Sequence, residues 1–302
     1  MTSFVRRIAE PLGFPEEAIT ELELCAQKIF AAEGAYDRLL YAQELLFLKE
    51  GKDFMYELEP LYGSVDASPY SIDMVFLLFC AQPLKYVYKA RNMSDELYTE
   101  TMKDLLYKLI ECRDVKGVFG TFVIEWYKKF YTCERVKLGR LQFETRAYPL
   151  SEPFRDIYKE GDTVIGCHIP SSGPLRYEDV IDSLKRAYEY YGDRLKNGRL
   201  YVYCHSWLMY PPYAGTVFKE GSNLYRFLNL FELIRVEKDP SYTDFFRVFN
   251  RDFDPTELDS LPEDTTLRRN LKKFLQEGNQ MGDAYGFIEF DGERILTEKK
   301  EI

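Results

Sequence analysis

Two histidines are the residues of this sequence best suited to acid–base chemistry. The chain of 302 residues has only His168 and His205, and a cysteine precedes each, giving Cys167-His168 and Cys204-His205. Imidazole titrates near neutral pH, so either histidine could act as a general base, although a histidine in a buried strand is also commonly structural. Histidine and cysteine are zinc ligands as well, which raises the question of a metal site.

Strand geometry argues against the metal. Each Cys-His pair lies in a short apolar run typical of a β-strand, TVIGCHI (163–169) and LYVYCHSWL (200–208). Side chains alternate along a strand, so the cysteine and the histidine of each pair must point to opposite faces. A Cys2His2 zinc site needs all four groups to converge, so we expect no metal. If the two strands pair in parallel, one face carries both histidines and the other both cysteines.

An amphipathic helix over residues 175–194 is predicted between the two strands, with Ile181, Leu184, Tyr188 and Tyr191 on its inner stripe. Such a strand–helix–strand unit is nearly always a right-handed crossover between parallel strands. We therefore expect the two histidine strands to be neighbours in one sheet.

The loop that leads into this helix, IPSSGP (169–174), places Ser171, Ser172 and Gly173 just before the helix N-terminus. Backbone N–H groups and hydroxyls in that position can bind a phosphate, and ligands of parallel strands usually lie at their carboxyl ends. Glu178 and Asp179 already complement the helix dipole, so a capped turn without a ligand is the alternative.

Composition excludes several classes of protein. With 46% hydrophobic and 30% charged residues the chain resembles ordinary soluble globular proteins, and its net charge of −10 disfavours a nucleic-acid binder. The longest apolar run, 74–81, is too short to span a bilayer. The six cysteines form no CxxC motif and the N-terminus lacks a secretory apolar core, so we expect a cytoplasmic location with reduced thiols. Walker A, Rossmann glycine and G-x-S-x-G motifs do not occur.

The residue pattern changes near residue 132, which predicts an α+β protein of two domains, an all-helical one over 1–132 and a mixed α/β one over 133–302. Helices are predicted at 16–30, 36–49, 71–90, 94–112 and 118–131. The second domain is predicted to contain a strand at 135–147, a turn-rich linker at 148–162, the histidine unit, a short helix at 223–229, a hairpin of strands 231–237 and 245–249, and a tail (262–302) of a helix at 266–278 and a hairpin of 285–290 with 294–297.

Several segments together resemble a bacterial family of acyltransferases that have a helical N-terminal domain and a GNAT-like C-terminal domain. The family pattern is H-I-P-x-x-G-P-L, then C-H-S-W-L, then S-N-hydrophobic-x-x-F, and the likeness covers nearly the whole chain. The matching segments are KLGRLQFE (137–144), CHIPSSGPL (167–175), CHSWLMYPPY (204–213), EGSNLYRFLNLFEL (220–233) and LPEDTTLRRNL (261–271).

The resemblance implies a central, partly parallel sheet in which acyl-CoA or acetyl-CoA lies between the two histidine strands. The loop at 171–174 would take the pyrophosphate, although it reads IPSSGPL where GNAT enzymes carry Q/R-x-x-G-x-G/A. The hairpin at 231–249 would supply the last two core strands. The predicted cofactor contacts are Ser171, Ser172, Gly173, Ser206 and Asn223.

The function that follows is an acyl-CoA-dependent N-acyltransferase acting on a small-molecule amine or a peptide. His168 or His205 would be the base, and Tyr210 or Tyr213 would protonate the leaving thiolate. One alternative is a non-catalytic module that binds acyl-CoA or a nucleotide. Another is a transferase that uses Cys167 or Cys204, which is disfavoured because the adjacent histidine faces away.

Overall fold

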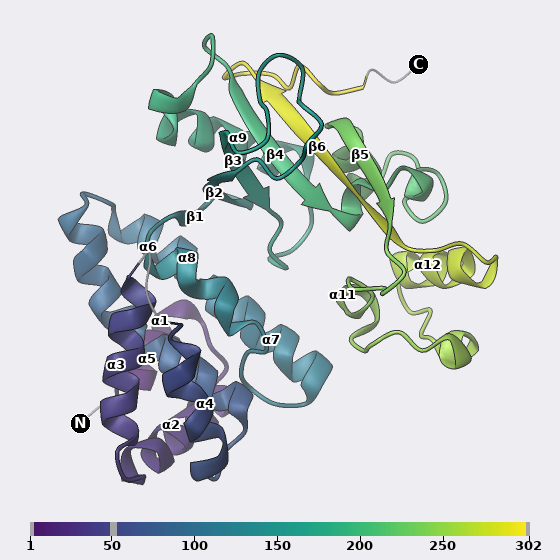
Figure 1. Ribbon diagram of the computed structural model, residues 1–302. Coiled ribbons are helices and arrows are strands. Elements are labelled where there is room, and N and C mark those ends of the chain that lie inside the picture. Colours follow the sequence, from purple (N-terminus) through teal and green to yellow (C-terminus); the bar gives the residue numbers. More distant parts are fainter. Residues whose placement is uncertain (1–2, 49–52, 300–302) are drawn as a thin grey trace. The chain divides into compact units, whose positions relative to one another are not determined.

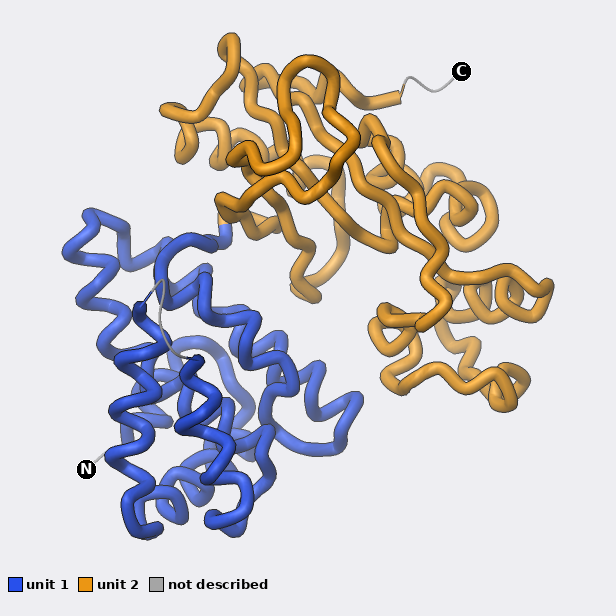
Figure 2. The backbone as a smooth tube through the Cα atoms, in the orientation of Figure 1, with its two compact units in different colours: residues 1–137 blue, residues 138–302 orange. Residues whose placement is uncertain are grey.

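A computed structural model describes residues 3–48 and 53–299 and shows a helical first part and a sheet-containing second part (Figure 1). The backbone forms two compact units, Met1–Lys137 and Leu138–Ile302 (Figure 2). The domain boundary between residues 132 and 133 stays a prediction. Within the described residues, no helix combines the length and the apolarity needed to cross a membrane.

The first unit is helical, as predicted. Its elements are α1 (Phe4–Leu12), α2 (Glu16–Ala31), α3 (Ala35–Phe47), α4 (Met55–Ser64), α5 (Pro69–Ala90), α6 (Asp95–Met102), α7 (Asp104–Lys116), the 3-10 helix η1 (Ile124–Tyr127) and α8 (Lys128–Tyr131). The prediction missed α1 and α4, and it joined α6 and α7 into one helix. The predicted helix 36–49 corresponds to α3, and its last residue, Lys49, lies outside the described residues. Helix α5 is the centre of this unit, because its run from Met74 to Leu78 has no exposed side chain.

The predicted helix at 118–131 is wrong in its first half, for a steric reason. Thr121 N–H donates to the Tyr70 carbonyl at 3.0 Å, and Ser71 Oγ donates to the Phe119 carbonyl at 2.9 Å. A Cβ at Gly120 would lie 2.4 Å from the carbonyl of Tyr70, so only glycine fits there. Tertiary hydrogen bonds to α5 thus replace the helical ones in this segment.

The second unit is built around one sheet of six strands in the order β1-β2-β3-β4-β6-β5. The strands are β1 (Arg135–Leu138), β2 (Leu141–Ala147), β3 (Thr163–His168), β4 (Leu200–Ser206), β5 (Glu232–Lys238) and β6 (Gly282–Phe290). The crossover from β3 to β4 contains α9 (Tyr177–Tyr190), which buries Val180, Leu184 and Ala187. The α+β fold with a partly parallel sheet is therefore confirmed.

Only β3 and β4 run parallel among the neighbours whose register is known, and their pairing is short. It joins Ile165 to Val202 and Gly166 to Tyr203, whereas β2·β3, β4·β6 and β5·β6 are antiparallel. Beyond Gly166 and Tyr203 the two strands no longer pair.

The second half of the predicted 231–249 hairpin is wrong. Residues 246–249 form the helix α11 (Phe246–Phe249), and β5 pairs with β6 instead. Phe245, Val248 and Phe249 are the buried residues here, and their spacing of three and four is helical. Strand β6, which was expected in a peripheral tail, lies inside the sheet between β4 and β5.

The rest of the tail and the short helix follow the prediction more closely. The helices α10 (Asn223–Leu228) and α12 (Thr266–Gln276) form where they were expected, and Ser222 and Thr265 cap them. The closing hairpin is reduced to an isolated antiparallel bridge between Phe290 and Ile295.

The linker 148–162, called the strap below, covers part of the sheet. Its Tyr148, Leu150, Phe154 and Tyr158 are buried together with Val164, Tyr201, Tyr203 and Phe287. Phe154 and Phe287 stack with ring centroids 4.2 Å apart, and Figure 1 shows the strap crossing in front of β4 and β6.

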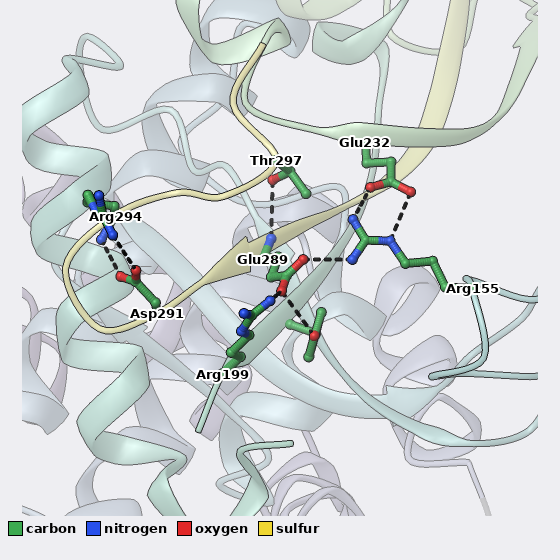
Figure 3. Close-up of polar contacts among 8 residues, drawn as sticks. Arg155, Arg199, Glu232, Glu289, Asp291, Arg294 and Thr297 are labelled. Carbon is green, nitrogen blue, oxygen red and sulfur yellow. Dashed lines mark hydrogen bonds and ion pairs between the residues drawn. The ribbon is translucent and has the colours of Figure 1, made fainter. Parts of the chain in front are cut away.

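A buried carboxylate fastens the strap to the sheet (Figure 3). Glu289 of β6 is 2% exposed and accepts hydrogen bonds from Arg155 Nη1 of the strap at 2.7 Å, from Arg199, and from Tyr201 Oη at 3.2 Å. Burial alone would raise the pKa of Glu289, but the hydrogen bonds from Arg199, Arg155 and Tyr201 outweigh it and lower the pKa below its usual value. Arg155 also pairs with Glu232 of β5.

We expect Glu289→Gln to lower the free energy of unfolding at pH 7 by about 2 kcal/mol, because two guanidinium groups lose their buried partner. Glu232→Gln is the matched control: it removes an exposed carboxylate from the same Arg155 and should cost less than about 1 kcal/mol. Urea titration of both variants measures this. Equal effects would show that burial of Glu289 does not matter.

Glu289→Gln also tests the lowered pKa of Glu289. A folded-state pKa below the unfolded value stabilises the protein above the unfolded pKa, about 4.3, and this contribution disappears as pH falls through the folded pKa. The stability difference between wild type and Glu289→Gln should therefore be constant above about pH 5 and shrink in acid. A difference that grows in acid would contradict the lowered pKa.

Candidate active site

His168, at the end of β3, has a buried carboxylate partner. The antiparallel register pairs Gln142 with His168 and Glu144 with Gly166, so Glu144 and His168 project from the same face. Nε2 of His168 lies 3.3 Å from Oε1 of Glu144, with the two side chains 20% and 2% exposed. Nη1 of Arg146 lies 3.9 Å from the same Oε1 atom. Glu144 can thus orient the imidazole.

His205, near the end of β4, forms a second pair. Its Nε2 lies 3.0 Å from Oδ1 of Asp283 on β6, and the imidazole is 41% exposed. The ring stacks on Tyr285, the register partner of His205, with centroids 3.8 Å apart and planes within 4°. The Tyr285 hydroxyl in turn donates to Glu237 at 3.2 Å.

Both histidines lie on one face of the sheet, called the histidine face. Gly166 and Tyr203 are register partners in the parallel pair, and His168 and His205 each follow two residues later. They therefore flank the point where β3 and β4 separate. An imidazole held by a carboxylate can accept a proton from an attacking nucleophile, so the face carries two candidate general bases.

The cysteines lie on the opposite face, as the alternation predicts. Cys167 and Cys204 are 2% and 1% exposed. A hydrogen bond with Cys167, together with burial, raises the pKa of Cys204 well above its ordinary value, so this sulfur stays a thiol. No group of three or more His, Cys, Asp or Glu side chains that could hold a metal ion occurs within residues 3–48 and 53–299.

Tyr210 lies close to the second histidine pair. It precedes the 3-10 helix η4 (Pro211–Tyr213) and is 5% exposed. Its ring packs edge-on against Tyr213, with ring centroids 5.1 Å apart. Burial first, and then the charge of Asp283, raise the pKa of Tyr210. Its phenol therefore keeps its proton at neutral pH and remains a possible proton donor.

The loop 169–176 is held by a residue that the sequence did not single out. Arg140, in the turn between β1 and β2, donates to the carbonyls of Pro170 at 2.8 Å, Gly173 at 2.7 Å and Pro174 at 3.1 Å. The guanidinium fixes the loop so that these carbonyls face Arg140.

Two kinds of donor remain in this loop for a phosphate. The Ser172 hydroxyl oxygen is buried and has no hydrogen-bond partner within the described residues. Helix α9 has no side-chain cap at Arg176, so its first-turn N–H groups are not capped. Ser171 and Gly173 are exposed, and Gly173 has φ of 109°, a conformation that favours glycine.

The other two predicted cofactor contacts lie apart from the histidines. Ser206 projects from the opposite face to His205, and its Oγ accepts the Leu208 N–H at 3.2 Å as a helix cap. Asn223 is exposed at the start of α10. Sequence reasoning missed Glu144, Asp283 and Arg140, because their roles depend on strand register and on a turn between strands.

We expect thiol reagents to label at most one of the six cysteines in the folded protein. Cys25, Cys80, Cys112, Cys167 and Cys204 are buried, and only Cys133 is partly exposed. Mass spectrometry after brief reaction with iodoacetamide, with a denatured sample as control for six labels, measures this. Rapid labelling of Cys167 or Cys204 would contradict their burial and would support a mechanism that uses a cysteine nucleophile.

Two known families match this chain. Residues 136–288 match a family described as GNAT-like C-terminal domain, and residues 3–133 match one described as N-acyltransferase N-terminal domain. The search of curated proteins found no match.

Solved structures of acyltransferases share the fold. One, a mutant bound to octanoyl-CoA, is 20% identical with a TM-score of 0.74. Another, bound to decanoyl-CoA and teicoplanin, is 20% identical with a TM-score of 0.70, and a third, bound to decanoyl-CoA, is 21% identical with a TM-score of 0.71. Each alignment covers 95% of this chain and 87% of the other.

Because the GNAT-like match spans more than half of the chain and follows directly on the N-acyltransferase match, the chain belongs to the family of N-acyltransferases that have a GNAT-like C-terminal domain.

Proposed function

We propose that this protein transfers an acyl group from acyl-CoA to an amine at the histidine face. The observation that carries the proposal is the pair of histidine–carboxylate contacts, 3.3 Å for His168 and 3.0 Å for His205, on either side of the point where the parallel strands separate. Membership of an N-acyltransferase family and the acyl-CoA molecules named for similar structures support it.

The acyl-CoA thioester would lie where β3 and β4 separate, with its pyrophosphate at the loop 169–176. The unpartnered Ser172 hydroxyl and the uncapped N-terminus of α9 are the donors that suit a phosphate. Ser171 and Gly173 would contribute from the exposed part of the loop, whereas Ser206 and Asn223 would have to reach other parts of the cofactor.

In this mechanism the amine nitrogen attacks the thioester carbon, and His168 or His205 takes the proton that the nitrogen loses. The new C–N bond forms, the C–S bond breaks, and the CoA thiolate accepts a proton. The Tyr210 phenol is our candidate for that last donor, because it lies near Asp283 and holds its proton at neutral pH.

The proposed acceptor is a small-molecule amine or a peptide, and the description of one related structure names teicoplanin beside decanoyl-CoA. A cytoplasmic location belongs to the same proposal, because all six cysteines are free, which suits a reducing compartment.

One observation keeps a second function open, a non-catalytic module that binds acyl-CoA or a nucleotide. Arg140 occupies three carbonyls of the loop, Pro174 has no N–H, and the Ser172 N–H already donates to the Pro170 carbonyl at 2.8 Å. The loop therefore offers fewer N–H donors than a glycine-rich pyrophosphate loop. Binding of octanoyl-CoA without acyl transfer to any amine would favour this module.

We expect His168→Ala or His205→Ala to lower kcat roughly 10²- to 10⁴-fold, the usual contribution of a general base. Acyl transfer from octanoyl-CoA to a panel of amines measures kcat, and calorimetry should find CoA affinity nearly unchanged. Cys167→Ala and Cys204→Ala are matched controls, because they alter the same strands on the opposite face. Full turnover in both histidine variants would reject a histidine base.

Ser172→Ala should weaken CoA binding about fivefold, the loss of one hydrogen bond. Ser171→Ala, which removes an exposed hydroxyl from the same loop, should have a smaller effect. Titration calorimetry with CoA measures both. If Ser172→Ala leaves the affinity unchanged, the pyrophosphate does not use this hydroxyl.

A further inference from the structure

Tyr203, on β4, has a buried hydroxyl with no hydrogen-bond partner in the part of the chain that the structure describes. The residue is 1% exposed, and its Oη has no hydrogen-bond partner among residues 3–48 and 53–299. A buried hydroxyl without a partner destabilises a fold, so native proteins keep one mainly where a ligand or a water completes it. Tyr201, two residues earlier on the same face, shows the ordinary case, because its hydroxyl donates to Glu289 at 3.2 Å.

The position of Tyr203 is as informative as its missing partner. Gly166 and Tyr203 form the last register pair of β3 and β4 before the strands separate. Tyr203 projects from the histidine face, two residues before His205, and its partner Gly166 precedes His168 by two. The hydroxyl therefore belongs to the face, and to the end of the parallel pair, at which acyl transfer is proposed.

The surroundings of the ring keep the phenol neutral. Tyr203 packs edge-on against Tyr148 of the strap and at a tilt against Phe287, with ring centroids 5.5 Å away in both cases. The Arg146 guanidinium lies 5.7 Å from the ring centroid. Burial raises the pKa of Tyr203, and the charge of Arg146 offsets only part of that rise. At neutral pH the group is thus an O–H donor among aromatic side chains.

Gly166 makes this arrangement possible. A Cβ at residue 166 would lie 2.9 Å from Cδ of Arg146 and 3.6 Å from Cγ of Glu144. Because glycine has no side chain, Arg146 can cross over β3 toward Tyr203. The side chains of Arg146 and Glu144 therefore cover the backbone at Gly166, and Gly166 is buried.

We propose that the Tyr203 hydroxyl donates a hydrogen bond to the thioester carbonyl oxygen of the acyl donor. The inference rests on the proposed acyl transfer. When the amine nitrogen bonds to the carbonyl carbon, this oxygen takes the electron pair of the C=O π bond and becomes an oxyanion. The Tyr203 O–H stabilises that charge without giving up its proton, and the pair returns to the carbonyl as the C–S bond breaks.

Tyr203→Phe removes only the oxygen. Loss of one such donor commonly costs 10²- to 10³-fold in kcat, so we expect a fall of roughly that size with octanoyl-CoA, and KM for octanoyl-CoA within about threefold. The melting temperature should stay the same or rise, because an unsatisfied buried hydroxyl is gone. Tyr201→Phe is the matched control: it should keep kcat and lower the melting temperature, because Glu289 loses a donor.

Infrared difference spectroscopy of octanoyl-CoA labelled with ¹³C at the carbonyl supplies a readout that a packing defect would not change. Without an amine acceptor, the carbonyl stretch of the bound thioester should lie at lower frequency in the wild type than in Tyr203→Phe. Equal frequencies together with unchanged kcat would overturn the proposal and assign a bound water to the hydroxyl. A wild type that binds octanoyl-CoA but transfers no acyl group would instead overturn the transferase itself, and this inference with it.

Discussion

The short parallel pairing of β3 with β4 is the constraint on which the rest of the second unit depends. Two register pairs, Ile165 with Val202 and Gly166 with Tyr203, fix which side chains share a face. A shift of one residue would move His205 to the face of Cys167 and separate the two histidines. Because pairing stops after these residues, both imidazoles lie just beyond the end of the β3–β4 ladder.

The other strands supply what the histidines need. Strand β2 brings Glu144 to His168, and β6 brings Asp283 and Tyr285 to His205. These partners must keep their positions for the imidazoles to be oriented, and the strap helps to hold them. Its aromatic side chains stack on Phe287 of β6, while its Arg155 pairs with Glu289 of the same strand. Aromatic packing and the ion pair of Glu289 therefore both act on β6, the strand that also carries Asp283, the carboxylate partner of His205.

Local sequence patterns predicted the parts of this fold that depend on local physics. Strand alternation separated each cysteine from its histidine, and helical periodicity found α2, α3, α5 and α9. Two of the failures involve long-range contacts. The carbonyl of Tyr70 keeps Gly120 and Thr121 out of a helix, and β6 enters the sheet between two strands that precede it in the chain. Glu144 and Asp283 carry no local signal, because only strand register brings them to the histidines.

The central claim is that the thioester lies on the histidine face where β3 and β4 separate. A crystal structure of the protein with octanoyl-CoA tests it most directly. We expect the thioester carbon between His168 and His205, its carbonyl oxygen within hydrogen-bond distance of the Tyr203 hydroxyl, and the pyrophosphate beside Ser172 and the first turn of α9. An octanoyl-CoA molecule bound with its thioester on the face of Cys167 and Cys204, or away from these strands altogether, would contradict the claim.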